Sequence, residues 1–188
     1  MTEIHKHGGD IYRHKNVLDF SSNCNPYGTP EGVKKAGAAA MELVCHYPDV
    51  ECEGLRRALA AAEEVPMESI ICGNGAADLI FGLALALKPG KALLPAPTFA
   101  EYEQALRAWG CETEYYFLSE EEGFCPGEGF LDHIGKDTDM VFFCNPNNPT
   151  GVAVEPEYLK KLAHRCRETE TFLVLDECFE DFLEEPQK

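Results

Sequence analysis

The sequence lacks the long hydrophobic runs that mark membrane proteins and secretory signals. Its longest strongly apolar stretch, from Leu79 to Leu87, is far shorter than the about 20 residues that a membrane-spanning helix requires. The first ten residues, MTEIHKHGGD, contain no apolar core of the kind found in a signal peptide. The sequence therefore predicts a cytoplasmic protein that does not insert into a membrane.

Paired cysteine motifs are also missing. The chain has nine cysteines, an odd number, and no two of them are spaced as Cys-x-x-Cys. A disulfide framework and a zinc site are therefore poorly supported, and no metal site is predicted. We expect reduced thiols, some of which, such as Cys72 and Cys144, lie in apolar segments where a thiol packs as a small core residue.

Positive charge is scarce. Sixteen lysines and arginines stand against 33 acidic residues, which gives a formal net charge of −17. A field of this sign repels nucleic acid and anionic membranes, so neither is expected as a partner. Basic residues and histidines form a local positive cluster between His5 and Lys15. An anionic ligand would therefore have to be held by local groups, because the overall field opposes it.

From residue 69 onward the sequence alternates short apolar strands with helices. This order predicts an α/β fold with a mostly parallel sheet and helices on both faces. Three of the strands, around residues 70–71, 141–143 and 172–175, are apolar throughout, which is typical of strands buried on both sides. The expected strands are 69–72, 91–95, 112–118, 140–144 and 172–175, with helices at 31–44, 53–64, 76–87, 99–109, 130–134 and 155–167 and an extended piece at 17–21.

Ligands of such sheets bind beyond the carboxyl ends of the strands, where this sequence places several polar motifs. Gly73–Asp78 opens a helix whose free N–H groups suit an anion. Phe99 follows the next strand, the amide-rich turn Asn145–Gly151 follows another, and Asp176 ends the last one. Singly, a tight turn, a core aromatic ring or a helix N-cap explains such residues equally well. Together they match a phosphorylated aromatic heterocycle with a protonated ring nitrogen, such as pyridoxal phosphate.

With these motifs the sequence resembles the fold-type I pyridoxal-phosphate enzymes. The resemblance extends from His7 to Phe182 and lies in the branch that holds threonine-phosphate decarboxylase of cobalamin biosynthesis and histidinol-phosphate aminotransferase. It rests on Asn-x-Asn-Pro-x-Gly at 23–28, Tyr47-Pro48-Asp49, Gly73-Asn74-Gly75-Ala76, Pro97-Thr98-Phe99, Asn145–Gly151 and Asp176-Glu177.

The resemblance implies a role for each of these positions in binding the cofactor. Phe99 would stack on the pyridine ring, Asn148 would hydrogen-bond the ring hydroxyl, and Asp176 would pair with the ring nitrogen. Tyr47 would reach the cofactor phosphate of the neighbouring subunit in a homodimer with shared active sites. The phosphate of the subunit's own cofactor would lie against the backbone of Gly75, Ala76 and Ala77.

The same resemblance implies a small phosphorylated amino acid as substrate, with His7, Asn25 and Gly28 close to it. Two details favour the decarboxylase over the aminotransferase. His7-Gly8-Gly9 is similar to the decarboxylase's contact with the substrate phosphate, and Phe179 stands where the aminotransferase typically has tyrosine. Histidinol-phosphate aminotransferase remains the alternative.

The sequence departs from the family at its end. The family's Schiff-base lysine lies well beyond the aspartate, whereas only the terminal Lys188 follows Asp176 here. We therefore expect an N-terminal arm and first helix at 1–45, an incomplete cofactor-binding domain at 46–188, and no C-terminal small domain. Such a fragment would be inactive alone. A non-catalytic remnant or binding module stays open. A nucleotide-binding domain fits less well, because residues 90–100 lack the ribose-binding acid expected about 20 residues after the glycines.

Overall fold

The computed structural model describes residues 8–184, and the chain divides between Cys72 and Gly73 into two units that we describe separately. The second, here called the sheet unit, holds four strands in the order β2-β1-β3-β4. All neighbouring strands are parallel, which confirms the predicted fold class. The strands are β1 (Lys91–Ala96), β2 (Glu112–Phe117), β3 (Met140–Cys144) and β4 (Phe172–Asp176).

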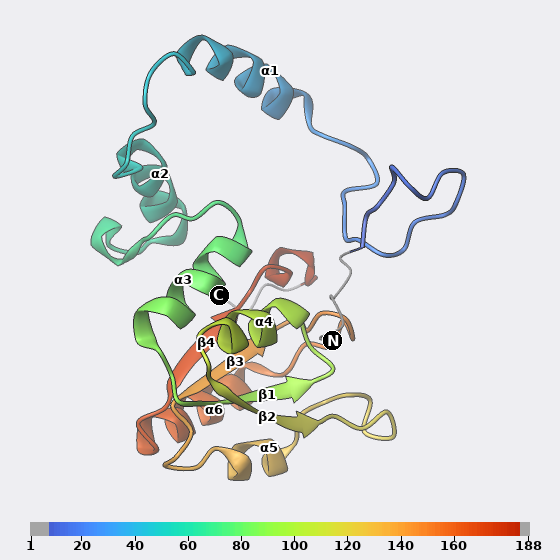
Figure 1. Ribbon diagram of the computed structural model, residues 1–188, viewed down its shortest axis with the longest axis vertical. Helices are drawn as coiled ribbons and strands as arrows, with labels where there is room; N and C mark the ends of the chain where they lie inside the picture. The colour runs from blue at the N-terminus through green and yellow to red at the C-terminus, as the bar shows by residue number, and fades with distance from the viewer. Residues whose placement is uncertain (1–7, 185–188) are drawn as a thin grey trace. The chain divides into compact units, whose positions relative to one another are not determined.

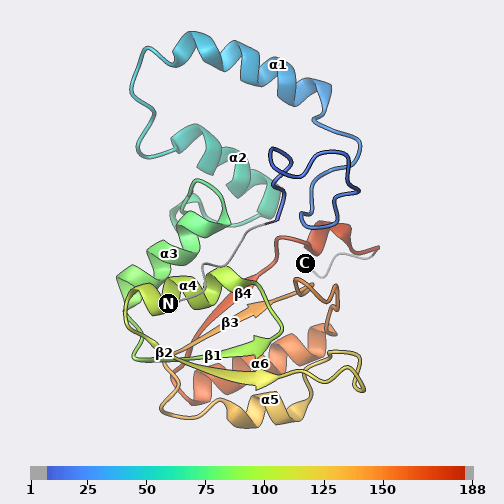
Figure 2. The same cartoon turned by 45° about the vertical axis from the view of Figure 1, so that its right-hand side comes forward.

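Helices cover both faces of this sheet. Helices α3 (Ala76–Leu87) and α4 (Ala100–Ala108) lie on one face, and α5 (Glu128–His133) and α6 (Pro156–Glu168) lie on the other (Figures 1 and 2). The two cores follow the alternation of side chains along each strand. Leu94 and Phe142 face α3 and α4, whereas Leu93, Val141 and Phe143 face α5 and α6.

The helix boundaries follow from local chemistry. Gly75 precedes α3 with φ +84°, a conformation that a residue with a Cβ rarely adopts. Pro156 is the first residue of α6, where its missing N–H costs no helical hydrogen bond. The five helices predicted between residues 53 and 167 are all present, with ends within two residues of the expected ones. The predicted helix 31–44 appears as α1 (Glu31–Ala40) followed by the 3-10 turn η1 (Met41–Leu43).

One predicted strand is wrong. Residues 69–72 form no strand, because the 3-10 turn η2 (Met67–Ser69) takes the start of this segment and the rest pairs with none of the four strands. Ile71 is 80% exposed and Ile70 and Cys72 are only half-buried, so the segment is not buried on both sides. An apolar sequence is a poor guide here because a strand also needs a neighbour that satisfies its backbone groups. The extended piece expected at 17–21 likewise joins no sheet.

Strand β4 is less buried than its sequence suggests. Leu173, Val174 and Leu175 are only half-buried, and Phe172 is 47% exposed. The reason is its position at the edge of the sheet, where β3 is its one neighbour among residues 8–184. By contrast β3, between β1 and β4, is buried along its whole length, as predicted.

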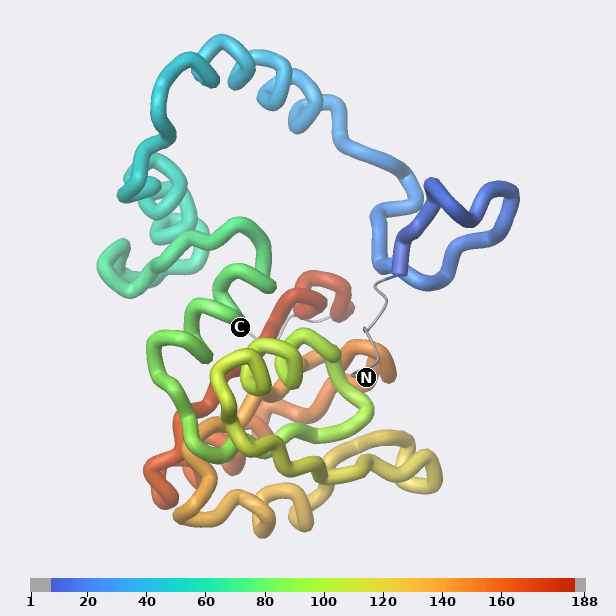
Figure 3. Tube along the Cα trace, in the orientation of Figure 1, coloured from blue at the N-terminus to red at the C-terminus, as the bar shows by residue number. Residues whose placement is uncertain are grey.

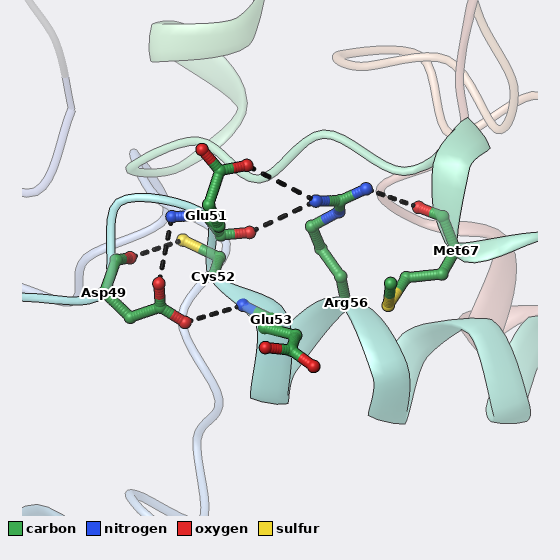
Figure 4. Close-up of polar contacts among 6 residues, drawn as sticks. All are labelled: Asp49, Glu51, Cys52, Glu53, Arg56 and Met67. Carbon is green, nitrogen blue, oxygen red and sulfur yellow. Dashed lines mark hydrogen bonds and ion pairs between the residues drawn. The ribbon is translucent and has the colours of Figure 1, made fainter.

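The N-terminal unit, residues 8–72, has no buried residue and therefore no core of its own. Polar contacts order the start of α2 (Glu53–Glu63), as Figure 4 shows. The Asp49 carboxylate accepts hydrogen bonds from the backbone N–H groups of Glu51 (3.0 Å) and Glu53 (2.8 Å). Arg56 donates to the backbone carbonyls of Glu51 (3.3 Å) and Met67 (2.9 Å), which ties α2 to η2.

The described helices are too short or too polar to cross a membrane. The domain division predicted near residue 45 concerns the complete family fold and stays a prediction.

The buried position of β3 generates a stability prediction. Phe142 is fully buried and its ring stacks on Tyr102 with centroids 4.9 Å apart. Phe142→Ala should lower the free energy of unfolding by about 3–5 kcal/mol, because it removes buried surface and leaves a cavity. The control Phe172→Ala, at the exposed end of β4, should cost less than about 1 kcal/mol. Urea unfolding followed by circular dichroism measures both, and equal losses would contradict this assignment of the core.

Candidate functional site

The candidate site lies at the carboxyl edge of the sheet. The loops after β2 and β3, yellow and orange in Figure 3, leave the sheet on the same side. The N-terminus of α3 reaches this edge as well, because α3 packs on the sheet and its C-terminus leads directly into the start of β1. Phe99 follows β1, and Asp176 is the last residue of β4. The structure thus brings together the motifs of the sheet unit that the sequence singled out.

Both carboxylate oxygens of Asp176 accept hydrogen bonds from nearby residues. The Tyr102 hydroxyl donates to Oδ2 at 2.6 Å, and the Cys178 backbone N–H donates to Oδ1 at 3.0 Å. The side chain is only partly buried, so part of the carboxylate stays accessible. Together the two contacts fix the orientation of the carboxylate. The alternative reading of Asp176 as the N-cap of the next helix does not hold, since η3 (Glu180–Phe182) begins later and Phe179 precedes it.

Tyr102 is the site residue that the sequence reasoning missed. Its side chain is fully buried between α4 and β3, with the Phe99 ring edge-on at 5.5 Å. Burial, followed by the hydrogen bond to Asp176, raises the pKa of Tyr102 far above its ordinary value. The hydroxyl is therefore a neutral, permanent donor. The available signal was the spacing Phe99-x-x-Tyr102, which places both rings on one side of a helix start.

The N-terminus of α3 presents free backbone donors. No side chain among residues 8–184 caps it, and the N–H groups of Ala76 and Ala77 in its first turn lack a helical acceptor. The nearby carboxylate of Asp78 is turned back to the loop, where it accepts from the Asn74 N–H at 2.9 Å. Ala76 packs against the same core cluster as Phe99.

Two of the three asparagines in the loop after β3 are buried, and the third is partly exposed. Asn145 is buried, and its Oδ1 accepts from the Val154 N–H at 2.9 Å. Asn147 is buried too, and its side chain contacts the Pro97 carbonyl (3.0 Å) and the hydroxyls of Thr98 (3.0 Å) and Thr150 (2.9 Å). Two of the three amides therefore serve the loop itself.

Asn148 differs from its neighbours. Its side chain is half-exposed, and its amide has no hydrogen-bond partner among residues 8–184. The side-chain amide of Asn148 is therefore accessible to a ligand. Its contact with the cofactor hydroxyl stays a prediction.

The remaining predicted residues lie outside the sheet unit. Tyr47 is 99% exposed and belongs to the N-terminal unit. Asn25 and Gly28 form a turn in the same unit, in which the Asn25 amide donates to the Gly28 carbonyl at 3.0 Å. His7 lies outside the described residues. The roles of these four residues stay predictions. No cluster of three or more potential metal ligands occurs among residues 8–184.

Comparison with known proteins identifies the family. Residues 15–188 match the model of the family described as aminotransferase class I and II. The chain belongs to this family. A threonine-phosphate decarboxylase of Salmonella typhimurium is 40% identical over 185 residues, which cover 94% of this chain and 51% of the relative. A histidinol-phosphate aminotransferase of Rubrobacter xylanophilus is 31% identical over 172 residues, which cover 90% and 48%.

Solved structures give the same result for the fold of this class I and II aminotransferase chain. The L-threonine-O-3-phosphate decarboxylase from Porphyromonas gingivalis superposes with a TM-score of 0.69 at 27% identity, over 82% of this chain and 45% of that one. The resemblance stated from the sequence is confirmed. The chain spans about half the length of the curated relatives that it matches.

The adjacent asparagines give a matched pair of variants. Asn147→Ala removes three hydrogen bonds of a buried side chain, so it should cost about 1–3 kcal/mol of unfolding free energy. Asn148→Ala should stay within about 0.5 kcal/mol of the parent, because its side chain holds nothing in place. Urea unfolding of both variants is the measurement. A larger loss for Asn148→Ala would show that its amide supports the loop.

Proposed function

We propose that this chain forms the cofactor-binding half of a pyridoxal-phosphate site in a cytoplasmic enzyme. The observation that carries the proposal is the Asp176 carboxylate, which is held between two donors at the carboxyl edge of the sheet, near Phe99. The class I and II aminotransferases are pyridoxal-phosphate enzymes. The cofactor has a phosphate, an aromatic ring, a ring hydroxyl and a basic ring nitrogen, and each of these finds a suitable group here.

The residues at the edge would share the cofactor as follows. The N–H groups of Ala76 and Ala77 would donate hydrogen bonds to the phosphate at the positive end of the α3 dipole. Phe99 would cover one face of the ring and exclude water, and Asn148 would bind the ring hydroxyl. Asp176 would hold a proton on the ring nitrogen. When bound, the protonated cofactor supplies an electron-accepting ring that stabilises negative charge on the substrate carbon.

For the whole protein we propose decarboxylation of L-threonine O-3-phosphate in cobalamin biosynthesis. The greater identity to the threonine-phosphate decarboxylase supports this activity over that of histidinol-phosphate aminotransferase. Phe179 supports it as well, because phenylalanine cannot donate the second hydrogen bond to the ring hydroxyl that a tyrosine there would make. We further propose a homodimer, in which the exposed Tyr47 reaches the partner's cofactor phosphate.

The activity can be tested on the reading frame that contains residues 1–188, expressed as far as it stays open. With pyridoxal phosphate present, the product should release carbon dioxide from O-phospho-L-threonine. The Asp176→Asn variant should be at least about a hundredfold slower, because an unprotonated ring is a poorer electron acceptor. Transamination of histidinol phosphate without carbon dioxide release would instead support the aminotransferase. Activity on neither substrate would favour the non-catalytic alternative.

The lysines between residues 73 and 184 generate a second prediction. Lys88 and Lys136 lie before strands and Lys91 is the first residue of β1, so all three are at the opposite edge of the sheet from Asp176. Lys160 and Lys161 lie on α6, in ion pairs with Glu157 and Glu128.

A covalent bond to the cofactor aldehyde needs an amine held close to it, and these lysines are not placed there. After the 188-residue chain is mixed with pyridoxal phosphate and reduced with borohydride, peptide mass mapping should find no stoichiometric label on any one lysine. Free lysine in the same mixture controls for the reduction. Full labelling of one specific lysine would place the chemistry elsewhere in the chain.

A further inference from the structure

The packing of the Tyr102 ring does not require its hydroxyl group. The ring is fully buried, stacks on Phe142 at 4.9 Å and 12°, and meets the edge of Phe99 at 5.5 Å. A phenylalanine would fill the same space with the same ring contacts. Burying a hydroxyl costs free energy unless it finds a partner, and the partner here is Asp176.

The contact between Tyr102 and Asp176 has the geometry of a charge-assisted hydrogen bond. Its 2.6 Å length lies in the range typical of a hydroxyl that donates to a carboxylate. Tyr102 belongs to α4, and Asp176 is the last residue of β4. The hydrogen bond therefore connects a helix that covers the sheet to the end of an edge strand. It fixes the direction in which the carboxylate points, because the Cys178 N–H holds only the other oxygen.

We propose that Tyr102 is a positioning residue for the proposed cofactor site. Its hydroxyl aims the Asp176 carboxylate at the ring nitrogen, and the ring stack on Phe142 keeps that hydroxyl in place. Phe99 packs on the same tyrosine. Tyr102 therefore contacts both Phe99, which would cover the cofactor ring, and Asp176, which would bind the ring nitrogen. The inference rests on the proposed function, since it concerns how this chain holds that cofactor.

A first test needs no cofactor. The unfolding equilibrium constants of the 188-residue chain are compared for the parent, Tyr102→Phe, Asp176→Asn and the double variant. If the two side chains act together, the fold-change in the unfolding equilibrium constant of the double variant should be about tenfold smaller than the product of the two single fold-changes. Changes that simply multiply would overturn the proposed link. The pair Tyr158→Phe and Asp176→Asn is the control, because the Tyr158 hydroxyl donates to the Gly127 carbonyl instead (3.1 Å).

A second test separates positioning from packing. The dissociation constants of pyridoxal 5'-phosphate and of its 1-deaza analogue, which has carbon in place of the ring nitrogen, are measured for the product of the open reading frame. The parent should prefer pyridoxal phosphate. Tyr102→Phe should reduce this preference about tenfold, as expected for a lost hydrogen bond to a charged group, while affinity for the analogue stays constant. Tyr158→Phe should change neither value.

The outcomes distinguish the two proposals. A parent that binds neither compound, or both equally, overturns the cofactor site and this inference with it. A parent that prefers pyridoxal phosphate, with the preference intact in Tyr102→Phe, overturns the role of Tyr102 alone. Equal weakening of both compounds in Tyr102→Phe would mean that the hydroxyl only stabilises the fold.

Discussion

The sheet unit depends on one constraint, which is that β3 must be buried on both faces. Its residues alternate between two cores, so Phe142 meets α3 and α4 while Val141 and Phe143 meet α5 and α6. A strand buried in this way can have polar groups only where it ends. Its backbone is satisfied by β1 on one side and β4 on the other. Polar groups of the buried strands therefore lie where the strands end. Because the strands are parallel, their carboxyl ends share one edge of the sheet and their amino ends share the other.

The carboxyl edge shows how a binding surface is built on such a sheet. Some of its polar side chains are used to hold the loops: Asn145 and Asn147 are buried and bonded within the turn after β3. Asn148 and the first N–H groups of α3 are left available. Asp176 lies between these two classes, because it is held by two donors and yet partly exposed. That combination suits a group that must keep its charge and its direction while it binds a ligand.

The segments that are less buried than their sequences suggest share a physical cause. Ile71 and the strand β4 are apolar in the manner of interior strands, but residues 8–184 supply no further strand beside them. Edge strand β2 is different, because it carries charged side chains at Glu112 and Glu114, a common protection against unwanted pairing. An apolar sequence therefore shows that a segment can form a buried strand. Whether the segment is buried depends on the neighbouring strands and helices.

The sequence by itself determined the order of strands and helices in the sheet unit, because side-chain periodicity and glycine or proline at helix ends are local properties. It also predicted that Phe99, the Asn145–Gly151 turn, Asp176 and the turn before α3 lie at one edge, since parallel strands end at the same edge of a sheet. Only the tertiary structure decided that residues 69–72 are not a strand, as pairing depends on distant segments. Only the structure revealed Tyr102, whose partner lies 74 residues away in the chain. A hydrogen bond between separate elements leaves no periodic trace in a sequence, and the packing that creates it exists only in the fold.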